Sequence, residues 1–208
     1  MIKTFKRTHK QYVFILLLNY FGQVILIGII SSAFVAFWDL FLHWLSIFAA
    51  PLKEPEMWWI IIPIWINWLF TEFFQEKHGT SFGNAISNGA IAIFASIDWT
   101  RYTYRLYTEG IIRSFTFGVF LKIIASFGVF VYGLYVIMLG IRTHKLAFFI
   151  GRIRWVTYLL VMLTPIVYNV IKMNIYTLLA IIVFFPLYYW FIEIFDRITP
   201  EPRTYKQS

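Results

Sequence analysis

The chain has 208 residues, of which 60% are apolar, 22% aromatic and only 13% charged, and its formal net charge is +8. Soluble globular domains contain about 25% charged residues, so this composition excludes an ordinary soluble domain and predicts repeated membrane crossings. Basic residues lie just outside the apolar runs rather than along one soluble face, so nucleic acid is not expected as a partner. The absence of cysteine excludes disulfides, thiolate metal sites and a cysteine nucleophile.

The N-terminal region places a basic segment ahead of a long apolar run. Residues 1–11 are predicted to form a basic cytoplasmic N-terminus. The run from Tyr12 to Phe37 is too long for a cleavable signal sequence, so we expect a retained first membrane helix. Residues 38–50 are predicted to extend it as an amphipathic segment in the membrane interface. The basic residues ahead of the run are Lys3, Lys6, Arg7 and Lys10.

Five further apolar segments follow along the chain. Trp58 and Trp59 mark the start of the second segment, as expected for aromatic residues at a membrane interface. The third is barely long enough to cross and is the most polar, and Thr80 or Ser81 is predicted to cap its helix. Prolines lie inside the second, fifth and sixth segments. The predicted spans cover residues 57–74, 81–97, 115–139, 155–171 and 175–195.

Together these segments predict an all-α fold, a polytopic bundle of six transmembrane helices within residues 12–195. Residues 196–208 are predicted to form a loose cytoplasmic tail. Twelve lysines and arginines lie in the predicted cytoplasmic segments and five in the outer ones, which favours a cell-membrane protein with both termini in the cytoplasm. The five outer residues are Lys53, Arg101, Arg105, Arg113 and Lys172.

The third predicted span carries amides, hydroxyls and small residues where the other spans carry bulky apolar side chains. At 100° per residue, Asn84, Asn88 and Asp98 fall within one sector of the helix, with Ser87 at its edge. We expect this helix to be the central one, because amides facing lipid would lack hydrogen-bond partners. A neighbouring stripe has the small-residue spacing that lets another helix approach closely. That stripe consists of Ala85, Gly89, Ala92 and Ser96.

Acidic residues at the end of the second span are expected to meet these amides. Glu72 and Glu76 lie one helical turn apart, at the cytoplasmic end where Asn84 also lies. We therefore predict a binding site of Glu72, Glu76, Asn84, Asn88 and Ser87 for a cation, a proton or a neutral polar group. The alternative is that the amides only hold helices together while Glu72 reaches interfacial water.

Two further sets of charges are predicted to pair. Lys122 lies about two turns inside the fourth span, and Asp98 closes the third span at the same outer level, so we expect a structural ion pair. The alternative is that Lys122 faces an outward cavity and binds an anionic group. At the inner end, Glu193 is predicted to pair with Arg152 or Arg154.

The segment from Thr100 to Arg113 interleaves arginine with tyrosine. Between two membrane spans, this pattern is typical of an amphipathic helix in the interface rather than of a nucleic-acid contact. We therefore predict a separate interfacial helix after the third span. Its tyrosines are expected at head-group depth, and they are Tyr102, Tyr104 and Tyr107.

Function is less specified than fold. No nucleotide-binding loop, serine-hydrolase elbow or zinc-protease motif occurs, and the four histidines lack metal-ligand spacing, so no enzyme, metal or cofactor is predicted. The sequence is compatible with a small transporter or channel-like protein that uses the cytoplasmic polar site. The alternative is a non-catalytic membrane subunit or scaffold whose polar residues only pack helices. A lipid-modifying enzyme using Glu72 or Glu76 as a base ranks last, since no nucleophile or metal set accompanies them. Expected partners are membrane lipids and either a second copy of the chain or a partner subunit.

Overall fold

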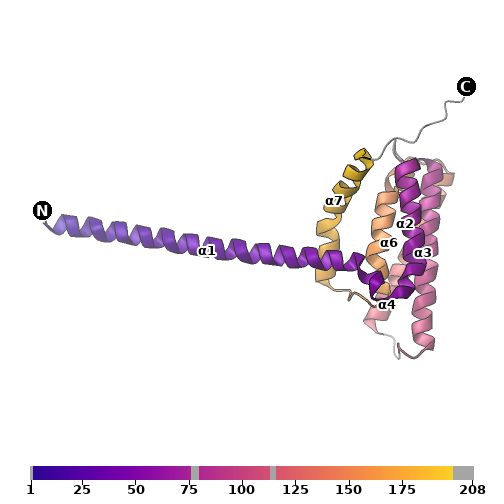
Figure 1. The fold of residues 1–208 in the computed structure, drawn as a ribbon, viewed down its shortest axis with the longest axis horizontal. Coiled ribbons are helices and arrows are strands. Elements are labelled where there is room, and N and C mark those ends of the chain that lie inside the picture. Colours follow the sequence, from indigo (N-terminus) through magenta and orange to yellow (C-terminus); the bar gives the residue numbers. More distant parts are fainter. Residues whose placement is uncertain (1, 76–79, 113–115, 199–208) are drawn as a thin grey trace, which may run out of the picture. The chain divides into compact units, whose positions relative to one another are not determined.

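The computed structural model contains only helices among the residues that it describes (Figure 1). It describes residues 2–75, 80–112 and 116–198, without the side chains of residues 2–22, 24, 74 and 75. The chain forms two compact units, residues 1–42 and 43–208. The predicted all-α class is therefore confirmed for the described part of the chain.

Seven α-helices and three shorter helical segments make up the described chain. The α-helices are α1 (Ile2–Phe48), α2 (Trp58–Phe70), α3 (Phe82–Thr108), α4 (Phe117–Ile141), α5 (Ala147–Ile150), α6 (Ile153–Val167) and α7 (Ile175–Ile198). The shorter segments are two 3₁₀ turns, η1 (Ala50–Leu52) and η2 (Pro55–Met57), and a π-helical segment, η3 (Thr71–Gln75).

Three stretches of described helix are long and apolar enough to cross a membrane: Ile25–Phe48, Phe117–Ile141 and Ile175–Ile198. The other three predicted spans do not reach this standard, for different reasons. Helix α2 has 13 residues before its π-helical end and α6 has 15, whereas a simple crossing takes about 20. Helix α3 is long enough but carries Asp98, Arg101 and Arg105 in its second half.

Helix α3 corrects the predicted division at Ile97. It continues through 27 residues to Thr108, so the third span and the proposed interfacial helix are one element. It begins where Ser81 accepts a hydrogen bond from the backbone amide of Asn84 (3.1 Å), which confirms the predicted cap. Tyr104 and Tyr107 are exposed, but Tyr102 is buried and its ring stacks on that of Tyr168 at 3.8 Å.

Helices α3 and α4 cross at two glycines. A methyl group added to Gly89 would lie 2.8 Å from the carbonyl oxygen of Gly133, and one added to Gly133 would lie 2.7 Å from that of Gly89. Only glycine permits so close an approach of two backbones. The predicted small-residue stripe is thereby confirmed as a helix-packing surface, since its other members, Ala85, Ala92 and Ser96, are buried as well.

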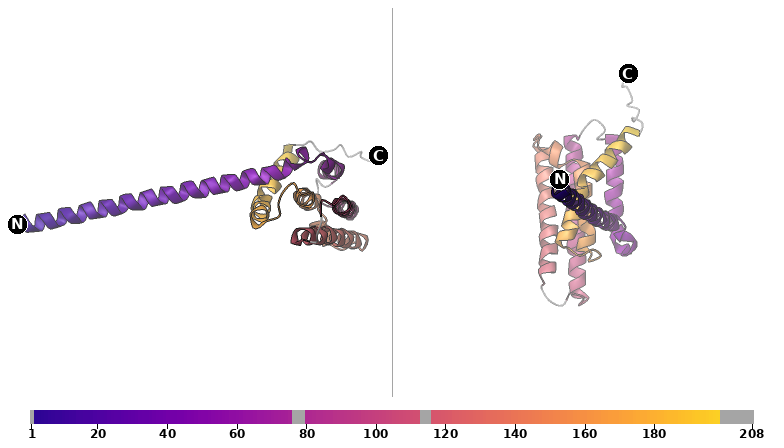
Figure 2. Two further views of the ribbon diagram at one scale, coloured as in Figure 1. Left: turned by 90° about the horizontal axis from the view of Figure 1, so that it is seen from below. Right: turned by 90° about the vertical axis from the view of Figure 1, so that its left-hand side faces the viewer.

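Within residues 43–208, α2, α3, α4 and α6 lie side by side (Figures 1 and 2). Helix α3 contacts α2, α4, α5 and α6. The most buried helix, however, is α6, in which twelve of 15 residues are buried, compared with eleven of 27 in α3. The expected central position of the third helix is therefore shared with α6, whose apolar residues pack on several neighbours at once.

Helix α7 contacts α6 and changes direction along its length (Figure 1). It contains Pro186, and a proline inside a helix removes one backbone hydrogen bond and bends the axis. The last turns of α1, from His43 onward, also contact α6 and α7. Trp44 donates to the hydroxyl of Tyr158 (2.9 Å), and His43 forms a hydrogen bond with Thr177 (2.9 Å).

Candidate functional site

The most unusual residue of the described chain is a buried arginine at the start of α6. Arg154 lies in the first turn of this helix and is only 1% exposed. Burying a guanidinium costs several kcal/mol unless charged partners compensate it. The surroundings of Arg154 therefore define a cluster of charges, whose members come from three separate elements.

Three carboxylates surround this guanidinium. Glu72, on η3, accepts hydrogen bonds from Nη2 and Nε of Arg154 at 2.5 and 2.6 Å. On α7, Glu193 accepts at 2.8 Å and Asp196 at 3.4 Å. The ring of Tyr189 lies 5.0 Å from the guanidinium carbon, within the range of a cation–π contact. We call Arg154, Glu72, Glu193, Asp196 and Tyr189 the arginine cluster.

Glu72 enters this cluster because the second helix changes its winding. At Thr71 the α-helix gives way to the π-helical segment η3, and single π-helical turns occur frequently at functional sites. Glu72 is 2% exposed, so its carboxylate lies inside the protein rather than in interfacial water. The predicted alternative, in which Glu72 reaches interfacial water, does not fit this position.

Several polar atoms near Arg154 have no hydrogen-bond partner among the described residues. They include Oε2 of Glu72, Oδ1 of Asp196 and the hydroxyl of Tyr188, all inaccessible to solvent. Buried polar groups are normally paired, and an unpaired one costs about 1–3 kcal/mol. One guanidinium contacts three carboxylates here, and Glu193 is also paired with Arg197 (3.4 Å). The buried and unpaired Oε2 of Glu72 is an acceptor that suits a proton or a small cation.

A cavity of about 710 Å³ adjoins the arginine cluster. Arg152 and Tyr189 line it, and Arg152 donates to the hydroxyl of Tyr189 at 2.8 Å. Tyr189 contacts both the cavity and the arginine cluster, because it lines the cavity and its ring lies 5.7 Å from the guanidinium carbon of Arg152 and 5.0 Å from that of Arg154. The remaining walls are aromatic or hydroxyl-bearing residues: Thr80, Ser81, Phe82, Phe148, Phe149 and Trp155.

Asn88 holds the chain just ahead of Arg154. It is fully buried, donates to the carbonyl oxygen of Gly151 (2.8 Å) and accepts from the side chain of Asn67 (3.2 Å). Gly151 itself has no room for a side chain, since an added methyl group would lie 2.7 Å from the methyl of Ala85. These contacts position the turn between α5 and α6, and therefore the start of the helix that carries Arg154.

The other predicted site residues are distributed differently. Asn84 is half-buried at the start of α3, and Ser87 is exposed. Glu72 binds Arg154, whereas Asn88 binds Gly151 and Asn67. Glu76 lies outside the described residues. These partners of Glu72 and Asn88, which are Arg154, Gly151 and Asn67, do not belong to the predicted site.

At the far end of α3, Asp98 and Lys122 do not form the predicted ion pair, and each has other partners. Asp98 accepts from Arg101 (2.8 Å) and from the hydroxyl of Tyr168 (2.6 Å). Lys122 donates to the side-chain oxygen of Asn169. The reason is local: Arg101 lies one turn from Asp98 on the same helix, where it meets the carboxylate without bridging two helices.

Sequence reasoning identified one contact of Arg154 but not its central role. The predicted pairing of Glu193 with Arg152 or Arg154 is confirmed for Arg154. The pairing of Arg154 with Glu72 joins residues that are 82 positions apart in the sequence, and no local sequence pattern predicts such a contact. The sequence signal for this role is the position of Arg154 directly before the apolar segment 155–171. The same position is typical of a basic residue in a cytoplasmic loop.

No group of three or more metal-ligating side chains occurs among the described residues. The chain matches no protein-family model, no curated protein and no solved structure.

Proposed function

We propose that the protein is a small multi-pass membrane transporter or channel-like protein that moves protons, or a small cation, past the arginine cluster. The observation that carries this proposal is the buried carboxylate of Glu72 at Arg154, whose second oxygen, Oε2, is inaccessible to solvent and has no hydrogen-bond partner among the described residues. A proton on this oxygen would weaken the Glu72–Arg154 pair, and its departure would restore the pair. Such a two-state contact is the minimum that a proton-transfer site requires.

We further propose six crossings with both termini in the cytoplasm. Contacts between residues that are predicted to lie on the same side of the membrane support this arrangement for residues 43–208. Glu56, in the predicted first outer loop, forms an ion pair with Arg105 in the predicted second outer loop. Arg154, at the start of α6, and Glu193, near the end of α7, are both predicted to lie on the inner side, and they form an ion pair. Each ion pair thus joins two residues that the distribution of basic residues assigns to the same side of the membrane.

Proton flux into liposomes that contain the pure protein and a trapped pH-sensitive dye tests the transport proposal. We expect the unmodified chain to dissipate an imposed pH gradient and Glu72→Gln to abolish this flux, because the amide cannot take up a proton. Glu109→Gln is the matched control, since Glu109 is an exposed acid that pairs with Arg105 (3.3 Å). Absence of flux from the unmodified chain would contradict the proposal.

A second candidate is a non-catalytic membrane subunit or scaffold. The contacts of Asn88 favour it, because this buried amide holds Gly151 and Asn67 in place and leaves nothing directed at a solute. In this case the polar residues stabilise the bundle, and function lies in docking a partner. Co-purification of a partner in fixed stoichiometry, together with the absence of flux, would support this candidate over the first.

A further inference from the structure

A second buried cation lies at the opposite end of α6 from the arginine cluster. Lys122, in the second turn of α4, is 7% exposed, and its ammonium group donates to the side chain of Asn169, just beyond the end of α6. Among the described residues, no carboxylate lies within ion-pair distance of this ammonium. A lysine has three N–H donors, so Lys122 retains donors for a further acceptor.

The surroundings of Lys122 favour an anion. Two pockets, of about 390 and 380 Å³, each include Gly118, Lys122 and Asn169 in their walls. The second also includes Lys172, and no aspartate or glutamate lines either of them. Gly118 lies in the first turn of α4, where the helix dipole adds positive potential. Two cations without an acid therefore face the same space.

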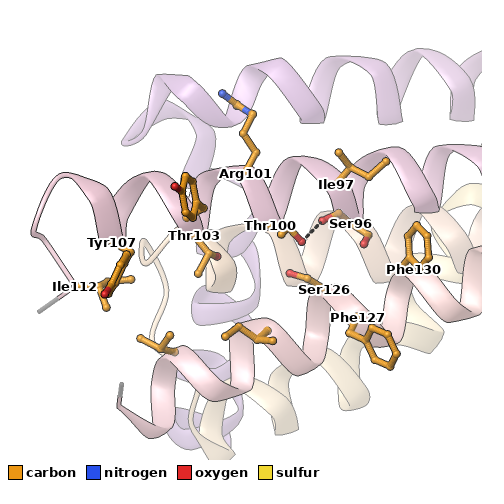
Figure 3. Close-up of a pocket in the computed structure, with 13 residues that line it drawn as sticks. Ser96, Ile97, Thr100, Arg101, Thr103, Tyr107, Ile112, Ser126, Phe127 and Phe130 are labelled. Carbon is orange, nitrogen blue, oxygen red and sulfur yellow. Dashed lines mark hydrogen bonds between the residues drawn. The ribbon is translucent and has the colours of Figure 1, made fainter. Parts of the chain in front are cut away.

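A long apolar groove adjoins this positive region. It lies between α3 and α4, has a volume of about 850 Å³, and shares Ile112 and Val119 with the first lysine pocket (Figure 3). From Val119 to Phe130 it follows α4 for about 16 Å, at a rise of 1.5 Å per residue. Arg101 also borders the groove, but its guanidinium is bound to Asp98. Lys122, by contrast, has no carboxylate partner among the described residues.

We propose that this site binds one anionic phospholipid. Its phosphate lies at Lys122 and Lys172, and one of its hydrocarbon chains follows the groove past Val119 towards Phe130. An amphiphile fits because Lys122 lines both lysine pockets, and the first of them shares Ile112 and Val119 with the apolar groove, whereas a soluble anion would leave the groove unfilled. The site does not depend on the transport proposal, since none of its residues belongs to the arginine cluster.

Native mass spectrometry of the full chain in detergent tests this site, with phosphatidylglycerol, phosphatidylcholine and inorganic phosphate as separate probes. We expect one phosphatidylglycerol to remain bound, in preference to phosphatidylcholine, and inorganic phosphate to leave the complex intact. Lys122→Met keeps the length of the side chain but removes its charge, and we expect it to weaken phosphatidylglycerol binding roughly tenfold, as loss of a charge-assisted hydrogen bond does.

Two neighbouring residues of α4 provide a matched pair for the groove. Ile123 lines the groove and is 47% exposed, whereas Ile124 is 48% exposed and lies outside it. We expect Ile123→Trp to reduce lipid retention severalfold and Ile124→Trp to leave it unchanged. Equal retention by Lys122→Met and the unmodified chain would overturn the proposal, as would equal losses in the two tryptophan variants, or binding of inorganic phosphate without lipid. If Lys122→Met fails to fold, the tryptophan pair decides.

Discussion

At the scale of single residues, the structure depends on polar side chains that are buried with a specific partner. Among the described residues, Arg154 pairs with side chains from η3 and α7, so its charge links three elements. Asn88 connects α3 to Asn67 on α2 and to Gly151 ahead of α6. In both cases the cost of removing one partner is the desolvation of the group left behind, rather than the modest net worth of the bond itself.

Replacing Arg154 by methionine should therefore destabilise the protein strongly, by roughly 3–5 kcal/mol, because Glu72 would remain buried without a counter-charge. The double variant Glu72→Leu with Arg154→Met should recover part of this loss, since it removes both charges. Thermal unfolding in detergent measures both effects. Arg197→Met is the control, because Arg197 forms only an exposed pair with Glu193 (3.4 Å) and should cost less than about 1 kcal/mol.

Asn88→Leu should cost about 1–3 kcal/mol, since the carbonyl of Gly151 and the amide of Asn67 would each lose a hydrogen-bond partner. The neighbouring variant Ser87→Leu changes an exposed position and should leave the unfolding temperature almost unchanged. The same thermal measurement compares the two. Similar shifts in both variants would show that the side chain of Asn88 does not hold α2, α3 and the turn at Gly151 together.

At the scale of elements, the pairing of α3 with α4 depends on small residues more than on apolar area. Gly89 and Gly133 bring the two backbones together, and association of membrane helices relies on such close packing because lipid is as apolar as the helices are. The same two helices enclose the apolar groove at their other end. The glycine crossing and the groove are therefore two parts of one helix pair.

Two glycines of α4 allow a direct test of this crossing. Gly133→Ala should destabilise the protein by about 1–3 kcal/mol, as overpacking does, because the new methyl group would meet the backbone of α3. Gly128→Ala, on the same helix, meets nothing within 4 Å and should stabilise it by about 0.5–1 kcal/mol through higher helix propensity. Equal effects on the unfolding temperature would contradict the close crossing.

At the scale of the whole molecule, the proposed topology assigns each loop to one side of the membrane. The chain contains no cysteine, so a thiol reagent can react only with a cysteine that is introduced by mutation. In sealed vesicles with the outer face exposed, Glu109→Cys should react with a membrane-impermeant maleimide, and Lys145→Cys should react only after permeabilisation. Both positions are exposed in the structure. Reaction of both cysteines in sealed vesicles would exclude an odd number of crossings between them, and with it the proposed topology.

The sequence by itself determined the helical class, most helix positions, the small-residue stripe and the cap at Ser81. Each follows from local information: apolar run length, residue size at helical spacing, or a hydroxyl at a helix start. The position of Glu72 in an apolar setting also predicts that it is a site residue. These features need no knowledge of which helix lies beside which.

Only the tertiary structure decided which charges meet. It assigned Arg154 to Glu72, Asp98 to Arg101 and Tyr168, and Lys122 to Asn169. It also joined the predicted third span and interfacial segment into α3 and placed the most buried surface on α6. The physical reason is that a buried charge selects its partner by distance across packed helices, and that distance is set by the packing of the whole bundle rather than by any stretch of sequence.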